Sequence, residues 1–211
     1  MLTEEKINQN KELFIQRVRG IQRSGAKIEE LINKLENSDF FTAPSSTKYA
    51  GAFKGGLCAH CLSVYDNLIH LLTIKPFSEN LPSSDTVAII ALFHDFYKMN
   101  FYETYYQNKK VYSASGSKRD EGGRYDWEAV SAYKVRDVEN RFLFGNNEMT
   151  AEFMIRCYIP LTLEESVAIL HHLGGKGFDS AEDSVPEIFE RYPLALYLHM
   201  AEMMSTYIDH E

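Results

Sequence analysis

The chain has 211 residues, of which 45% are hydrophobic and 25% are charged. This length and composition are typical of one globular domain, and they exclude a fibrous or disordered protein. The net charge is −8 and the basic residues are scattered, which argues against a broad nucleic-acid-binding surface. A small phosphorylated ligand needs only one cationic pocket, so the charge distribution is compatible with such a ligand.

The sequence also indicates a compartment. The longest apolar run spans residues 87–93, whereas a membrane-spanning helix needs about 20 residues. The first turns contain no hydrophobic signal-peptide core. The three cysteines Cys58, Cys61 and Cys157 form an odd, sparse set, which fits free thiols. We therefore expect a cytoplasmic protein with no membrane partner.

The N-terminal part of the chain predicts helices. Residues 3–37 repeat apolar positions at helical spacing, Thr3 is a good N-cap, and Gly20 to Gly25 predicts a bend. We treat residues 1–32 as an N-terminal helical arm and residues 33–211 as the main domain. Residues 38–56 are rich in Pro, Ser and Gly and predict a loop. The helix that follows places His60 on the same stripe as apolar residues.

Further along, residues 85–99 predict an apolar, central helix with His94 and Asp95 near its C-terminal end. Residues 101–126 alternate aromatic and polar positions and predict an inserted β-hairpin. Helical spacing returns over residues 127–140, 148–157, 163–173 and 186–208. The expected fold class is mostly α, a single-domain helical bundle with a small β-hairpin insertion.

Candidate metal ligands occur on three of the predicted helices. His94 and Asp95 are adjacent at the end of an apolar helix, and His60 faces the core of another. Glu202 is the only acid in the apolar stretch 194–208, where an unpaired carboxylate would be costly. Mixed nitrogen and oxygen ligands suit divalent Mn, Fe, Ni, Zn or Mg. The simpler alternative is a hydrogen-bonded core histidine beside an ordinary Asp95–Lys98 helix pair.

The motifs resemble the HD domain superfamily of metal-dependent phosphohydrolases, in the form found in a prophage-type and bacterial group. The resemblance covers roughly residues 33–209 and rests mainly on five short tracts. They are Tyr49-Ala50-Gly51-Ala52-Phe53-Lys54-Gly55-Gly56-Leu57-Cys58-Ala59-His60, Leu92-Phe93-His94-Asp95, Lys98-Met99-Asn100-Phe101-Tyr102, His172-Leu173-Gly174-Gly175 and Leu198-His199-Met200-Ala201-Glu202. The resemblance implies an HD-type helical bundle whose metal is held by His60, His94, Asp95 and Glu202.

The resemblance also implies a reaction and the residues that serve it. It implies hydrolysis of a phosphate mono- or diester, with a nucleotide as the favoured substrate. Asp95, Lys98 and His172 are the expected catalytic residues. Phosphate contacts are expected from Lys98, His171, His172 and the start of a helix at Gly55 and Gly56, where backbone N–H groups can meet an anion. The helical wheel favours His171 as the inward residue, while the resemblance favours His172.

Three departures from the group's pattern keep a second hypothesis open. Ala50 and Asn146 stand where the group has histidines, and Glu202 stands where the last metal ligand is Asp. The alternative is therefore a degenerate HD domain that binds metal or nucleotide with little or no turnover. Oligomeric state, metal identity and the bond cleaved are not determined by the sequence. A zinc site at Cys58 and Cys61 is disfavoured because such a site needs four placed ligands.

Overall fold

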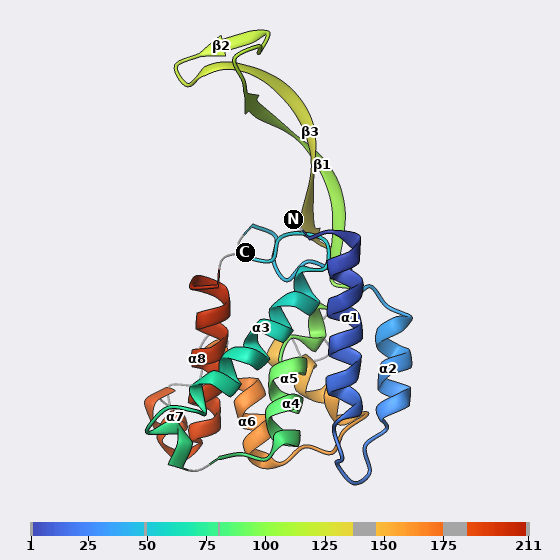
Figure 1. The fold of residues 1–211 in the computed structure, drawn as a ribbon, viewed down its shortest axis with the longest axis vertical. Coiled ribbons are helices and arrows are strands. Elements are labelled where there is room, and N and C mark those ends of the chain that lie inside the picture. The colour runs from blue at the N-terminus through green and yellow to red at the C-terminus, as the bar shows by residue number, and fades with distance from the viewer. Residues whose placement is uncertain (1, 49, 80, 137–146, 175–184, 210–211) are drawn as a thin grey trace.

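The structure is a computed structural model that describes residues 2–48, 50–79, 81–136, 147–174 and 185–209. Helices gather into one body, and a long β-arm projects from it (Figure 1). The helices of the body are α1 (Glu4–Arg19), α2 (Ile28–Glu36), α3 (Gly56–Leu71), α4 (Ser84–Phe93), α5 (Asn147–Arg156), α6 (Leu163–Leu170), α7 (Val185–Arg191) and α8 (Pro193–Tyr207). Among the described residues, no helix is long and apolar enough to cross a membrane.

The N-terminal helices form as their sequence predicts. Thr3 caps α1, because its side chain accepts a hydrogen bond from the N–H of Lys6 at 3.2 Å. The chain turns after Arg19 and resumes as α2. Phe14 and Val18 of α1 are fully buried in the same core as Leu31 of α2. The proposed boundary at residue 32 stays a prediction, but α1 packs into the main core.

Helix α4 is the centre of the body. All seven residues from Val87 to Phe93 are buried, and the side-chain hydroxyl of Ser83 caps the helix by accepting from the N–H of Thr86. The predicted extension of this helix to Met99 is wrong. It ends at Phe93, His94 is its C-cap, and a separate 3-10 helix covers Phe96–Lys98. Because the helix ends before Asp95, the Asp95 carboxylate can approach His94, and its Oδ2 lies 3.5 Å from His94 Nε2.

The expectation of a mostly α helical bundle is wrong, because the chain also forms a substantial antiparallel sheet. Its strands are β1 (Tyr102–Tyr112), β2 (Lys118–Asp120) and β3 (Gly123–Val135), in the order β1-β3-β2. The described part of the chain is therefore mixed α and β, with eight α-helices and these three strands. The prediction of antiparallel strands in this region is confirmed, but the predicted range, residues 101–126, is too short.

The error in length comes from residues 127–135, which were predicted to be helical. The spacing of their apolar residues is compatible with a helix or with a strand. These residues form a strand because they pair with β1: Tyr102 lies opposite Val135, and Lys110 lies opposite Trp127. Residues 137–140 of that predicted helix lie outside the described residues. The base of the arm is fixed to the body, since Tyr102 Oη donates to the Ser45 carbonyl at 3.2 Å.

The C-terminal helices differ from prediction in one respect. The predicted helix 186–208 is divided into α7 and α8, because Pro193 occupies the first turn of α8 and cannot continue α7. Helix α6 begins with a capping box formed by Thr162 and Glu165 and ends at Leu170. Helix α8 packs against α3 and α6. Cys58, Cys61 and Cys157 are free thiols, as expected.

Candidate metal centre

The fold brings the predicted ligands together at the centre of the body. His60 comes from α3, His94 and Asp95 follow the end of α4, and Glu202 comes from α8. The ligand atoms of His60, His94 and Glu202 lie within 4.8 Å of one another. The same limit holds for a second set that contains His94, Asp95 and His172. His94 belongs to both sets, so the two sets form one cluster.

The closest distances in the cluster involve Glu202. Its Oε2 lies 2.9 Å from His60 Nε2 and 3.2 Å from His94 Nε2. Asp95 Oδ2 lies 3.5 Å from the Nε2 atom of each of the same two histidines. A zinc-like ion stands about 2.0 to 2.2 Å from nitrogen and oxygen ligands. Donor atoms separated by about 3 to 4 Å can surround such an ion with small adjustments.

The cluster contains polar atoms whose hydrogen-bonding capacity is unused. Within the described part of the chain, Asp95 Oδ1, His172 Nε2 and Glu202 Oε2 are buried and have no hydrogen-bond partner. Glu202 Oε2 is near two imidazole nitrogens, but neither contact has the direction of a hydrogen bond. Unpartnered buried polar atoms are costly and rare in native proteins. Their convergence on one point fits a bound cation.

Hydrogen bonds on the far sides of the rings orient the histidines. Nδ1 of His94 lies 2.9 Å from the Ala91 carbonyl, and Nδ1 of His172 lies 2.7 Å from the Ile169 carbonyl. Since a carbonyl only accepts, each Nδ1 carries the proton, and each Nε2 turns toward the cluster. Metal-binding histidines are typically held in this way. His60 Nδ1 is paired with Ser205 Oγ at 3.1 Å.

Two hydroxyl residues that support the site were not found from the sequence. Ser205 contacts His60, and Thr206 Oγ1 donates to Glu202 Oε1 at 3.1 Å. Both follow Glu202 on α8 by three and four residues, which is one helical turn. Serine and threonine after a buried acid could have indicated such support. Neither residue type is diagnostic by itself.

Two carboxylates and one lysine lie beside the histidines of the site. Asp95 and Glu202 supply two carboxylates, whereas the nearest permanent cation is Lys98, whose Nζ donates to Asp95 Oδ2 at 2.6 Å. Burial works to lower the pKa of Lys98, but the charge of Asp95 outweighs it and holds that pKa well above its usual range. The Asp95–Lys98 ion pair was the simpler alternative to a metal site. In the structure, this ion pair and the cluster of potential metal ligands are both present.

The pKa values of the two fully buried imidazoles shift in opposite directions. Burial favours the neutral form of His94, but Asp95 and Glu202 outweigh it and raise the pKa of His94 to about 10. Burial and the neighbouring His94 lower the pKa of His172 to about 4. Despite burial, the pKa of Glu202 is well below its usual range because His60 and His94 face it. A metal ion and a proton would therefore compete for His94.

The position at which α6 ends determines which of His171 and His172 faces the cluster. His172 is fully buried, its Nε2 lies 3.8 Å from Asp95 Oδ1, and its ring centroid lies 5.0 Å from that of His94. His171 is the C-cap of α6 and belongs to neither group of potential ligands. Both side chains are buried, but it is His172 that reaches the cluster. Helix α6 ends at Leu170, so a helical wheel no longer describes the direction of either residue.

The two glycines at the start of α3 do not offer free donors. The N–H of Gly55 donates to the Thr42 carbonyl and that of Gly56 to the Phe53 carbonyl. The expectation that these N–H groups meet an anion is therefore not met. Their role is in packing: Gly55 has φ +81°, and a Cβ on Gly56 would lie 2.0 Å from the Gly51 carbonyl oxygen. Asn146 and Gly175, named above, lie outside the described residues.

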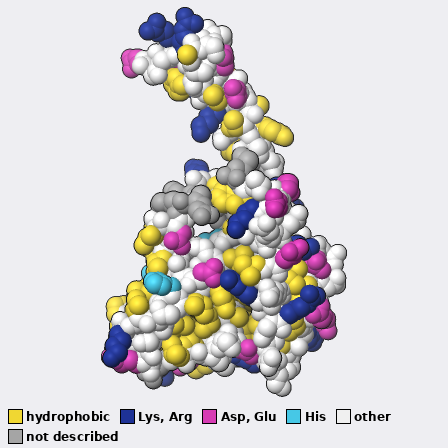
Figure 2. Space-filling model, in the orientation of Figure 1, with side chains coloured by type: hydrophobic (Ala, Val, Ile, Leu, Met, Phe, Trp, Pro, Cys, Tyr) yellow, Lys and Arg dark blue, Asp and Glu magenta, His cyan; other side chains and the backbone are white. Residues whose placement is uncertain are grey.

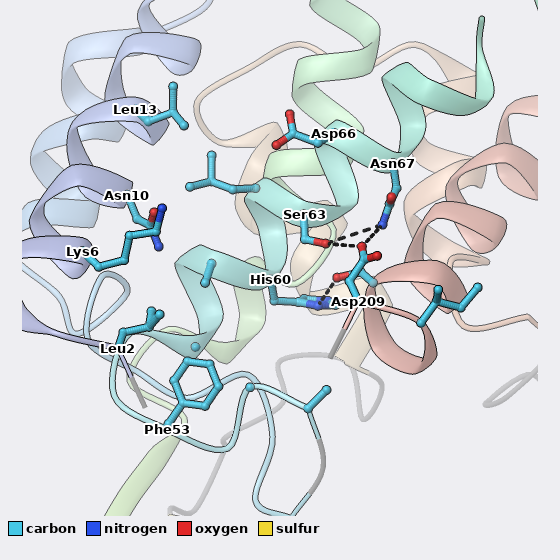
Figure 3. Close-up of a pocket in the computed structure, with 17 residues that line it drawn as sticks. Leu2, Lys6, Asn10, Leu13, Phe53, His60, Ser63, Asp66, Asn67 and Asp209 are labelled. Carbon is cyan, nitrogen blue, oxygen red and sulfur yellow. Dashed lines mark hydrogen bonds between the residues drawn. The ribbon is translucent and has the colours of Figure 1, made fainter. Parts of the chain in front are cut away.

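A cavity of about 520 Å³ adjoins the site on the His60 side (Figure 3). It lies between α1, α3 and the end of α8. Asp209 closes part of its rim, because its Oδ2 accepts from Ser63 at 3.0 Å and from Asn67 at 2.7 Å. Asn10 of α1 points into the cavity. Of the four predicted metal ligands, His60 lines it.

Comparisons with known protein families, with curated proteins and with solved structures found no match. Sequence and geometry are therefore the basis on which a function can be proposed.

Proposed function

We propose that the chain is an HD-type metal-dependent phosphohydrolase that acts on a phosphate mono- or diester, with a nucleotide as the favoured substrate. The observation that carries the proposal is the convergence of His60, His94, Asp95 and Glu202, in which Asp95 Oδ1 and Glu202 Oε2 are buried without a hydrogen-bond partner among the described residues. The resemblance of the motifs around these residues to HD phosphohydrolases supports the choice of reaction.

The residues present fit a divalent ion. Two imidazoles whose Nε2 atoms face the cluster and two buried carboxylates form a mixed nitrogen and oxygen donor set, which suits Mn, Fe, Ni, Zn or Mg. A bound ion of this kind polarises a phosphoryl oxygen and lowers the pKa of bound water. The replacement of Asp by Glu at position 202 is compatible with this arrangement, because Oε2 reaches both histidines.

The remaining residues are assigned by position. Asp95 orients the nucleophilic water through Oδ1, which has no other hydrogen-bond partner among the described residues. Lys98 lies beside Asp95 and supplies positive charge for the phosphate. His172 faces Asp95, and because the pKa of its imidazole is lowered to about 4, the ring is neutral near pH 7 and its Nε2 can accept a hydrogen bond from water or substrate.

The test combines metal content with turnover. Purified protein should contain a stoichiometric divalent metal by elemental mass spectrometry and should hydrolyse p-nitrophenyl phosphate or bis-p-nitrophenyl phosphate. His60→Ala should abolish both, whereas His70→Ala, an exposed histidine on the same helix, should change neither. Metal without turnover of any ester would favour the degenerate binding domain. Wild-type protein that takes up no metal would refute the proposal.

A further inference from the structure

The β-arm formed by β1 and β3 extends away from the helical body with little to cover it (Figure 1). The eleven residues of β1 pair with β3 along their whole length. At about 3.4 Å per residue, this ribbon is about 37 Å long. A two-stranded hairpin is marginally stable by itself in water, and a long one generally needs a surface to pack against.

The two faces of the arm differ in chemistry. Directly paired residues share a face, so Tyr106, Tyr112, Tyr125, Trp127 and Tyr133 all lie on one side, which we call the aromatic face. The opposite side carries the Glu103–Lys134 ion pair and the Lys109–Glu128 register pair. An arm with one aromatic and one charged face is the pattern of a sheet that is covered on one side.

The aromatic face is open to solvent in the described structure. Tyr106 is 76% exposed, Tyr112 is 50% exposed and Trp127 is 49% exposed. The rings are held in place, since Lys110 Nζ lies 4.4 Å from the centroid of Tyr125, and the rings of Tyr125 and Trp127 are 6.0 Å apart. Ordered aromatic side chains with this much exposure are typical of the centre of a protein interface.

The distribution of charge between the arm and the rest of the chain favours one kind of partner. Residues 102–135 contain six Lys or Arg and five Asp or Glu, so the arm carries +1 and the rest of the chain −9. Figure 2 shows Lys and Arg side chains gathered at the tip of the arm, and acidic side chains on the visible face of the body. A polyanion would be repelled by the body and by the acids in the arm. A second copy of the chain offers the arm both an aromatic face and an acidic body.

We propose that two copies dimerise through their arms, with the aromatic faces packed together and the arms antiparallel about a two-fold axis. This arrangement is self-complementary, as a two-fold interface must be. Antiparallel arms also bring the basic tip of each copy against the acidic body of the other.

The area of the arm predicts the strength of the dimer. A ribbon about 37 Å long and about 10 Å wide covers about 370 Å² per copy, which is below the roughly 800 Å² per partner of a standard interface. Contacts between tip and body must add to the interface. The dimer is therefore moderate in affinity and weakened by salt.

Trp127 is the only tryptophan, so its fluorescence reports directly on the aromatic face. Sedimentation velocity of the full chain should show a monomer–dimer equilibrium. Over the same concentration range, Trp127 emission should shift to shorter wavelength and become protected from acrylamide. Raising the salt concentration should reverse both changes.

Neighbouring tyrosines provide a matched control. Tyr106→Thr removes a ring from the aromatic face and should weaken dimerisation at least tenfold, whereas Tyr105→Thr makes the same change on the opposite face and should alter it less than twofold. Circular dichroism checks that both variants retain their strands. A protein that stays monomeric with Trp127 freely quenched, or equal effects of both variants, would overturn the proposal. Quenching of monomeric Trp127 by a single-stranded oligonucleotide would assign the face to nucleic acid instead.

Discussion

The ion pair between Arg23 and Glu165 joins the segments that deliver the site histidines. Glu165 is fully buried, and its carboxylate accepts from Arg23 Nη1 at 2.9 Å and from Nη2 at 2.6 Å. It also accepts from the Thr86 hydroxyl of α4 and from the N–H of Thr162 at the start of α6. Because α4 leads to His94 and α6 leads to His172, the pair fixes both helices.

Arg23→Met should therefore destabilise the protein substantially. The substitution leaves a buried carboxylate with two of its four donors, and loss of one partner from a buried pair costs about 3 to 5 kcal/mol. The Arg23 side chain is 20% exposed, which places the expected loss near the lower end of that range. For a chain of this size, a loss of about 3 kcal/mol lowers Tm by about 6 to 12 °C.

Urea unfolding followed by circular dichroism measures this loss. Arg19→Met is the control, because the Arg19–Glu29 pair is exposed and its loss should leave the midpoint nearly unchanged. The double variant Arg23→Met with Glu165→Met removes the unpaired charge and should recover part of the stability. If Arg23→Met is no more harmful than Arg19→Met, the reasoning about the buried pair fails.

Three further predictions concern pH and the site. Despite burial, Arg23, Thr162 and Thr86 lower the pKa of Glu165, so its contribution to stability is present above about pH 4.3, the unfolded value, and is lost as pH falls through the folded pKa. The stability difference between wild type and Glu165→Gln should shrink below that pH in acid titrations, and a constant difference would contradict the assignment. Glu202→Gln should abolish the metal-dependent rise in Tm, which corresponds to about 2.7 kcal/mol at a metal concentration of 100 Kd, while Glu202→Asp should retain it; equal rises would exclude Glu202 as a ligand. Lys98→Ala should keep metal by elemental analysis but weaken inorganic phosphate binding in calorimetry, and unchanged affinity would leave Lys98 as the partner of Asp95.

The sequence determined the identities of the residues that meet in the site. Apolar periodicity placed His60 on the core-facing side of a helix and His94 at the end of another, and Glu202 was the lone acid of an apolar stretch, where an uncompensated charge would be costly. Local signals also determined α1, α2 and the start of α6, where side chains such as Thr3 and Thr162 cap the first turn. These features depend on residues within one or two helical turns of each other, and a linear pattern contains them.

Tertiary structure decided what depends on distant pairing. Residues 127–135 fit a helix or a strand by pattern alone, and pairing of all nine with β1 makes them a strand. The choice between His171 and His172 depended on where α6 ends. The use of the Gly55 and Gly56 N–H groups depended on carbonyls of the preceding loop, and the contact of Ser205 with His60 joins residues 145 apart. Each was decided by hydrogen bonding or packing between segments that the sequence alone does not bring together.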